Sequence, residues 1–381
     1  MVIDEAALIR MRTNLAVIKD PRRVEWGNIR HKLVDMLVIA LCTIIIGEDE
    51  FEVMEEWALE RQDWLRGFLE LPNGIPDKDT FRRLFQRLEP KALLRSLNAW
   101  LNPETKPGGR EVNFDGKTLR GSGEPGDHQA LHIVSAWVRE HNLVLGQVVT
   151  DEKSNEITAI PEVLDMIDIK GDVITIDAMG CQTEIAKKIR KKNADYVFAV
   201  KENHPTLFND VKDYFDYLEE GPCQDKPAEQ WTSTLEKDHG RIERRSITTV
   251  TDLKWLDNKD AWKDLKTIIR YRSSRTIGET TTITDRYYIS SMAASAETFA
   301  GIIRRHWSIE NHLHWSLDVQ FREDDSQVRK ERAPENLNIL RKIALARLRA
   351  TEVPKKRSSI RRKMLKAVLN PQFLLEVLFG K

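Results

Sequence analysis

An ordered series of strand-like and helix-like segments between residues 111 and 201 restricts the fold of this chain more than any other feature. In chain order these are strands at 111–116, 131–139 and 143–150, a helix at 157–167, a strand at 172–178, a helix at 182–193 and a strand at 196–201. The turn between the second and third strands is short, so these two are predicted to form a hairpin. The whole series predicts an α/β fold (an α+β mixed sheet) with helices packed on the sheet.

The segments on either side of this series have different patterns. Residues 1–103 carry apolar side chains at helical spacing and predict an all-helical N-terminal domain. Residues 110–204 form the first part of the core, and residues 205–294 predict one helix followed by a β-rich insertion. A helix within 295–326 is predicted to complete the core, and residues 327–381 predict a basic helical C-terminal segment.

Charge is distributed unevenly along the chain. The formal net charge is zero, but residues 327–381 contain 15 Lys and Arg against 4 Asp and Glu, a net charge of +11. The remainder therefore carries −11. A basic tail on an acid-rich body fits a protein that holds metal ions in one place and phosphates in another, although a solvated helical surface has the same composition.

The three cysteines, Cys42, Cys181 and Cys223, show no paired spacing, which argues against a disulfide framework and against a zinc knuckle. Free thiols suit a reducing cytosol. Residues 1–12 lack the apolar core of a signal peptide. The longest apolar run, at 36–46, is shorter than the about 20 residues that span a bilayer and predicts a buried helix. We therefore expect a cytoplasmic protein without a membrane partner.

Three acidic residues stand in surroundings that acids rarely occupy. Asp115 and Asp177 lie within apolar segments that predict buried strands, and Glu310 lies among His and Trp rings on a helix-like segment. An unpaired carboxylate at the edge of a core is costly, so each one needs a partner. A divalent cation is the simplest partner that three carboxylates could share, and it points to metal-dependent chemistry on a phosphodiester.

Each of these acids also has an explanation that involves no metal. Asp115 precedes a glycine and could end its strand in a turn. Asp177 could cap the helix that follows it, and Glu310 could lie on a helix surface. Four nearby acids compete with Glu310 as the third ligand: Asp318, Glu323, Asp324 and Asp325.

Four short motifs follow one another along the chain, and three of them contain the three acids. They are Asp115-Gly116-Lys117-Thr118-Leu119-Arg120-Gly121-Ser122, Ile176-Asp177-Ala178-Met179-Gly180-Cys181-Gln182, Val200-Lys201-Glu202-Asn203-His204-Pro205 and His306-Trp307-Ser308-Ile309-Glu310-Asn311. In this order they resemble insertion-sequence transposases of the DDE class, and within that class the group that contains the H-repeat-associated proteins. The resemblance extends over nearly the whole chain, including the helical N-terminal segment.

The resemblance implies a ribonuclease H-like catalytic core in which Asp115, Asp177 and Glu310 bind two divalent ions. Mg²⁺ is the expected ion, and Mn²⁺ is expected to substitute for it. Two ions about 3.5–4 Å apart can activate a water or a 3′-hydroxyl and stabilise the leaving oxygen. In the family this chemistry cuts double-stranded DNA at the element's ends and joins the freed 3′-hydroxyl to target DNA. Pairing two ends implies a homodimer during the reaction, associated with the bacterial nucleoid when bound.

One part of the family's pattern is missing around the third acid. Many related transposases carry Tyr-x2-Arg-x3-Glu-x6-Lys there, and the aligned residues here are Ile303, His306, Glu310 and Leu317. The usual phosphate contacts therefore do not transfer to this chain. Four basic residues of the same segment are the expected substitutes: Arg304, Arg305, His306 and His314.

Other basic and polar residues are candidates for DNA contacts, and each has a plainer explanation. Lys117 and Arg120 follow Asp115 and could reach the scissile phosphate or balance local acids. Lys201, Asn203 and His204 follow a strand end, where loops often carry function. Arg241 and Arg244 in the insertion could grip the DNA backbone or protect a sheet edge. Arg82, Arg83 and Arg87 lie on a helix of the N-terminal domain that could bind DNA by entering a groove, but an ordinary amphipathic helix with a basic outer face is the favoured explanation.

The C-terminal helix-like run carries basic residues around an apolar face. The residues are Arg341, Lys342, Arg347 and Arg349. They predict salt-sensitive phosphate contacts.

Two other functions remain open at this point. A DNA-binding protein descended from a transposase could keep the acids without using them. A different nuclease on the same fold could act on junctions or RNA. Divalent-ion-dependent cleavage distinguishes the first alternative, and inverted repeats in the flanking DNA distinguish the second.

Overall fold

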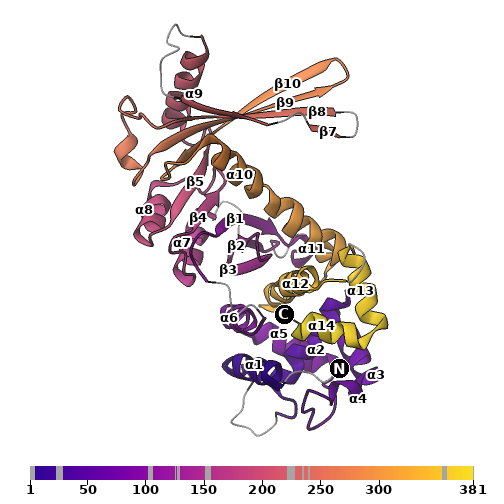
Figure 1. Cartoon of the computed structure of the whole chain (residues 1–381). Coiled ribbons are helices and arrows are strands. Elements are labelled where there is room, and N and C mark those ends of the chain that lie inside the picture. Colours follow the sequence, from indigo (N-terminus) through magenta and orange to yellow (C-terminus); the bar gives the residue numbers. More distant parts are fainter. Residues whose placement is uncertain are drawn as a thin grey trace.

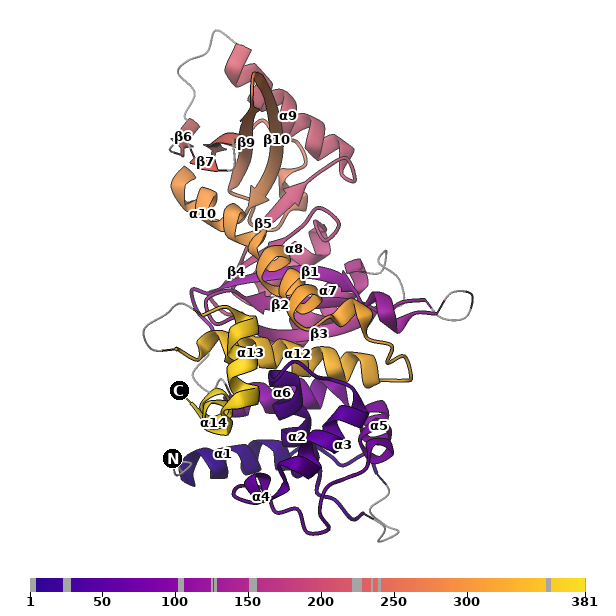
Figure 2. The same ribbon diagram turned by 90° about the vertical axis from the view of Figure 1, so that its right-hand side faces the viewer.

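The computed structural model describes residues 5–22, 29–101, 106–124, 126, 129–150, 156–220, 228–233, 236–238, 241–353 and 358–380. The chain folds into an elongated molecule with three tiers (Figures 1 and 2). A helical body that contains both termini lies at one end, a sheet with flanking helices lies in the middle, and a β-rich arm projects at the other end.

Five strands make the central part of the sheet. They are β1 (Glu111–Thr118), β2 (His132–Val138), β3 (Leu143–Thr150), β4 (Val173–Ile176) and β5 (Asp195–Val200). Their order is β3-β2-β1-β4-β5, with β1, β4 and β5 parallel and β2 antiparallel to both of its neighbours. This is the strand order of a ribonuclease H-like core, so the predicted fold is confirmed.

The insertion continues the central sheet. It contains α9 (Pro205–Glu220), β6 (Ala228–Thr232), β7 (Glu236–Asp238), β8 (Arg241–Val250), β9 (Thr267–Ile277) and β10 (Thr280–Ser290). β10 pairs antiparallel with β5, and the order runs on through β9 and β8 to β6, which gives a sheet of ten strands in the described part of the chain. The long ends of β8, β9 and β10 form the projecting arm (Figure 1).

Different helices cover the two faces of the sheet. Alternate side chains such as Phe114 and Ile176 join the core formed with α7 (Glu156–Met166), α8 (Thr183–Lys191) and α9. The opposite alternation points Asn113, Asp115 and Thr175 toward the other face, which α10 (Ala296–His306) crosses over a smaller apolar cluster. Ser295 begins α10 by accepting a hydrogen bond from the Thr298 amide at 3.2 Å.

The helical body is assembled from both ends of the chain. Its elements are α1 (Glu5–Ala16), α2 (Leu33–Ile45), α3 (Phe51–Glu60), α4 (Gln62–Leu65), α5 (Lys78–Arg87), α6 (Pro90–Leu101), α12 (Ala333–Ala350), α13 (Ile360–Leu369) and α14 (Pro371–Phe379). The apolar run predicted as a buried helix is α2, and it shares one core with α12. Asn336 of α12 donates to the Phe85 carbonyl at 2.8 Å and to the Leu88 carbonyl at 3.0 Å.

The predicted phosphate contacts of the C-terminal helix are wrong for three of its four basic residues. Arg341, Lys342 and Arg347 are all buried within the molecule. Arg341 pairs with Asp49 and Glu323, Lys342 donates to Ser135 and Gln147 at 2.8 Å each, and Arg347 donates to main-chain carbonyls. A helix in the middle of a bundle has no solvent face, so its cations serve as internal donors. No helix within the described ranges combines the length and apolarity that crossing a membrane requires.

Candidate active site

The sheet register brings Asp115 and Asp177 together. β1 and β4 are parallel neighbours, and Phe114 pairs with Ile176. Each of these two residues is followed by an aspartate, so the carboxylates of Asp115 and Asp177 lie side by side where the pairing of β1 with β4 ends. The Gly116 amide donates to Asp115 Oδ1 at 2.9 Å, and the Met179 amide donates to Asp177 Oδ1 at 3.1 Å.

Glu310 reaches the same place from the helix layer. α10 ends at His306, and residues Ile309–His314 continue as a π-helical segment before α11 (Trp315–Gln320). Such π-helical turns occur often at functional sites. Asp115, Asp177 and Glu310 line one cleft of about 890 Å³, so the structure brings together the three predicted acids.

The ionised form of Asp115 is electrostatically unfavourable in this cleft. Burial, together with the charges of Asp177, Glu156 and Glu310, raises the pKa of Asp115 to about 8. His314 Nδ1 lies 3.4 Å from Asp115 Oδ2. Burial, with Lys342 and Lys117 nearby, lowers the pKa of His314 to about 3, so its ring is neutral at pH 7 and does not balance the carboxylates.

The donor set of the cleft fits a hard divalent cation. Its carboxylate oxygens are the ligands that Mg²⁺ and Mn²⁺ prefer, and a bound cation would oppose the burial and the mutual repulsion that raise the pKa of Asp115. Within the described ranges, no three His, Cys, Asp or Glu side chains stand close enough to hold an ion in their present positions. The three acids thus share a cleft without closing to ligand distances.

A second acid near Asp115 was not predicted from the sequence. Glu156 is buried at the start of α7, and its Oε1 lies 2.7 Å from His132 Nε2. Thr118 Oγ1 lies 2.9 Å from the other ring nitrogen of His132. A Cβ atom on Gly116 would stand 2.3 Å from both Glu156 Oε1 and His132 Nε2, so this close approach requires glycine.

A second unpredicted group lies beneath the acids. Thr175 Oγ1 is 2.8 Å from Asn113 Oδ1 and 2.7 Å from His306 Nδ1. A sequence signal for it existed, because Asn113 and Thr175 are polar residues two positions before Asp115 and Asp177 in otherwise apolar strands. The period of a strand puts them on the same face as the acids.

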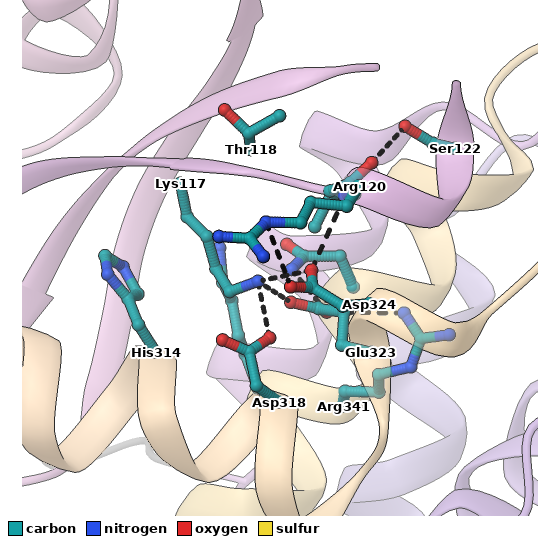
Figure 3. Close-up of polar contacts among 12 residues, drawn as sticks. Lys117, Thr118, Arg120, Ser122, His314, Asp318, Glu323, Asp324 and Arg341 are labelled. Atoms are coloured by element: carbon teal, nitrogen blue, oxygen red, sulfur yellow. Dashed lines mark hydrogen bonds and ion pairs between the residues drawn. The ribbon is translucent and has the colours of Figure 1, made fainter. Parts of the chain in front are cut away.

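Lys117 lies among the acids that compete with Glu310 (Figure 3). Its Nζ is 2.7 Å from Asp318, 3.3 Å from Glu323 and 3.2 Å from Asp324. The guanidinium of Arg120 approaches Asp324 at 3.5 Å, but most of its side chain is exposed. Lys117 therefore balances local acids in this structure, and three of the four competing carboxylates are occupied by it.

The predicted loop residues brace the segment that follows Asp177. Asn203 donates to the Ala178 carbonyl at 2.7 Å, and a ring nitrogen of His204 contacts the Cys181 carbonyl. Lys201 is exposed and lines the cleft with the three acids. Lys201 forms no ion pair within the described structure, so its positive charge is available to the cleft.

The two arginines at the end of α10 fasten this helix to the sheet. Arg305 pairs with Glu111 of β1, and Arg304 donates to Glu236 of β7 at 2.8 Å. These contacts fix the helix over the sheet and occupy both guanidinium groups.

The remaining predicted contacts lie away from the cleft. Arg82 pairs with Glu52 at 2.8 Å and also with Asp79, whereas Arg83 and Arg87 are exposed on the outer face of α5. In the insertion, Arg241 pairs with Glu243 at 3.1 Å and Arg244 is exposed. None of these five residues lines the cleft that holds the three acids.

One aromatic feature of the cleft was missed by the sequence reasoning. The Arg286 guanidinium stacks 5.0 Å from the Trp307 ring centroid, and Tyr287 and Tyr288 line the same cleft. Trp307 is 37% exposed, so its ring presents a flat apolar surface to the cleft beside a cation. The spacing of Trp307 from Glu310 was visible, but its pairing with a strand of the insertion was not.

Comparison with known proteins covers both halves of the chain. The family model described as Transposase DDE domain matches residues 106–347, and the model described as DDE_Tnp_1-associated matches residues 12–101. The "H repeat-associated putative transposase YhhI" of Escherichia coli (strain K12) is 39% identical over 381 residues, 98% of this chain and 98% of that protein. The "Putative transposase YncI" of Escherichia coli O157:H7 is 38% identical over 371 residues, 96% and 93% of the two chains. A cryo-EM structure of the piggyBac transposase synaptic complex with hairpin DNA aligns with a TM-score of 0.43 and 11% identity over 99% of this chain and 80% of that chain.

Proposed function

Because this chain belongs to the family of transposases with a DDE domain, we propose that it cuts DNA at the ends of an insertion sequence and joins the freed 3′-hydroxyls to target DNA. The observation that carries this proposal is the meeting of Asp115, Asp177 and Glu310 in one cleft. Two of these acids come from neighbouring strands and the third from the helix that covers them.

In the proposed reaction the three carboxylates hold two divalent ions, with Mg²⁺ as the native ion and Mn²⁺ as a substitute. The bound ions would supply a lowered pKa for the attacking hydroxyl and charge stabilisation for the leaving oxygen. The π-helical segment holds Glu310 over the sheet, and the pairing of Arg305 with Glu111 keeps that helix in register with β1. Lys201 and Arg286 offer positive charge to DNA phosphates along the cleft.

The proposed substrate is double-stranded DNA, and the proposed working unit is a homodimer that pairs two element ends. The reaction would take place on nucleoid DNA in the bacterial cytoplasm. Exposed basic residues outside the cleft are proposed as DNA-backbone contacts: Arg83, Arg87, Arg120 and Arg244.

The test is cleavage of DNA that carries the native flanking sequence, with and without Mg²⁺. Asp177→Asn removes one charge and keeps the shape of the side chain, so we expect nicking to fall by more than 100-fold while DNA binding stays within about twofold. Asp257→Asn, at an exposed position outside the cleft, is the matched control. Full cleavage by Asp177→Asn would refute the role of this acid. Metal-independent DNA binding without any cleavage by the wild type would favour a transposase-derived binding protein instead.

A further inference from the structure

A layer of three polar side chains lies directly beneath the layer of three acids. Asn113 and Thr175 face each other across β1 and β4, two residues before Asp115 and Asp177. His306 lies one helical turn before Glu310. Side chains two residues apart on a strand, or four apart on a helix, share a face. The amide of Asn113, the hydroxyl of Thr175 and the imidazole of His306 therefore lie on the same faces as the three acids.

The hydrogen bonds of this layer have only one consistent direction. Asn113 Nδ2 donates to the Arg305 carbonyl at 3.3 Å, which turns Asn113 Oδ1 toward Thr175. Thr175 has a single hydroxyl proton, and it donates that proton to Asn113 Oδ1 at 2.8 Å. Thr175 Oγ1 can then only accept from His306 Nδ1, which lies 2.7 Å away. His306 consequently carries its proton on Nδ1.

The other ring nitrogen, Nε2, is left with a lone pair. His306 lines the cleft that contains Asp115, Asp177 and Glu310, and Nδ1 is held on the sheet side by Thr175. Burial lowers the pKa of His306 to about 4, so the ring is neutral at pH 7. A neutral acceptor repels phosphate oxygens, and this tautomer is therefore unsuited to the phosphate contact predicted for His306 from the sequence.

We propose that His306 is a catalytic residue whose Nε2 accepts a hydrogen bond from the attacking hydroxyl, either water or a deoxyribose 3′-hydroxyl. Asn113 and Thr175 are positioning residues that hold the imidazole in the required tautomer. This inference rests on the proposed function, because it assigns an orienting acceptor to the nucleophile of that reaction. A fixed lone pair on a ring that lines the same cleft as the acids would align the nucleophile before attack.

The first experiment measures single-turnover cleavage of flanking-sequence DNA at saturating Mg²⁺. We expect His306→Ala to lower the rate by about 100-fold and Thr175→Val by about 10-fold, the value of one lost hydrogen bond. Thr175→Ser keeps the hydroxyl and should restore the rate to within about twofold of wild type. DNA affinity and the Mg²⁺ concentration for half-maximal rate should stay unchanged. His141→Ala and Thr267→Val are the controls, because His141 is exposed and Thr267 is a buried strand threonine bonded to Met292.

Full activity of His306→Ala in an active wild-type background would overturn the inference. A large rise in the half-saturating Mg²⁺ concentration, with full rate at saturation, would also overturn it, because Nε2 would then be an ion ligand.

The second experiment reads the tautomer by ¹⁵N NMR of histidine-labelled protein, assigned with His306→Ala. We expect a protonated Nδ1 and a bare Nε2 in wild type and a mixture in Thr175→Val. The reverse tautomer would refute the hydrogen-bond chain. If the wild type cuts no DNA, both the proposed function and the catalytic role of His306 are refuted. The NMR measurement would still test the hydrogen bonds from Asn113 through Thr175 to His306.

Discussion

Replacement of Asp115 by Asn should stabilise the metal-free protein at pH 8. Burial and the charges of Asp177, Glu156 and Glu310 raise the pKa of Asp115 from 3.8 to about 8, so the folded state favours the protonated carboxyl. A tenfold change in acidity is worth about 1.4 kcal/mol, which sets an upper limit of ~6 kcal/mol for this shift. The side chain keeps 23% exposure, and water screens part of the repulsion. We therefore expect a gain of about 2–3 kcal/mol, or a melting temperature roughly 4–8 °C higher.

The sign of the pH dependence follows from the raised pKa. Below pH 4 the carboxyl is protonated in both the folded and the unfolded state, so Asp and Asn should be equivalent. Between pH 4 and pH 8 the unfolded chain loses this proton first, and the wild type loses stability relative to the variant. The advantage of Asp115→Asn should therefore grow across this interval and level off above the folded pKa.

The assay is thermal unfolding in chelator at a series of pH values, repeated with Mg²⁺. Mg²⁺ should raise the melting temperature of the wild type and have little effect on Asp115→Asn, because the variant lacks one ligand charge. Asp257→Asn serves as the control for removal of an exposed acid. A gain that is the same at pH 4 and pH 8, or no gain at all, would show that neither burial nor the neighbouring acids raise the pKa of Asp115 in the folded protein.

Two further predictions concern basic residues outside the cleft. Lys117→Met removes one of the two cations that contact the fully buried Glu323, the other being Arg341, and should cost about 3 kcal/mol in denaturant unfolding. Arg120→Met, at a largely exposed position, should cost less than about 0.5 kcal/mol, and equal effects of the two substitutions would contradict the ion network. If α5 contacts DNA, replacing Arg83 and Arg87 together by Ala should reduce the slope of log affinity against log salt by about 2, while the pair Lys91→Ala and Arg95→Ala on α6 should leave it unchanged; an unaltered slope would exclude α5 from the interface.

The strands and helices of the core could be predicted because each has a recognisable apolar pattern within its own residues. Strand and helix periods gave β1 to β5 with α7 and α8, and the acids of β1 and β4 stood out because their strands are otherwise apolar. Once β1 and β4 are assigned as neighbouring parallel strands, their two aspartates are expected to lie together. The positions of Asp115 and Asp177 could therefore be predicted from the pattern of the residues around them.

The features that were missed depend on contacts between distant segments. Lys342 looks like a surface residue in sequence, yet it donates to Ser135 and Gln147 of the sheet. Trp307 and Arg286 meet only because β10 pairs with β5 and extends the sheet toward α10. A periodic pattern states which face of an element is apolar, but it does not state which other element covers that face.

The shared core of the helical body has a consequence for how the protein is made. Helices α2, α5 and α6 emerge from the ribosome early, but α12 supplies part of the interior on which they close. A nascent chain that stops before residue 333 would leave that apolar interior open to solvent, where chaperones and proteases act on it. Translation of α12 is thus a checkpoint, and prematurely terminated copies should be degraded rather than persist as stable N-terminal fragments.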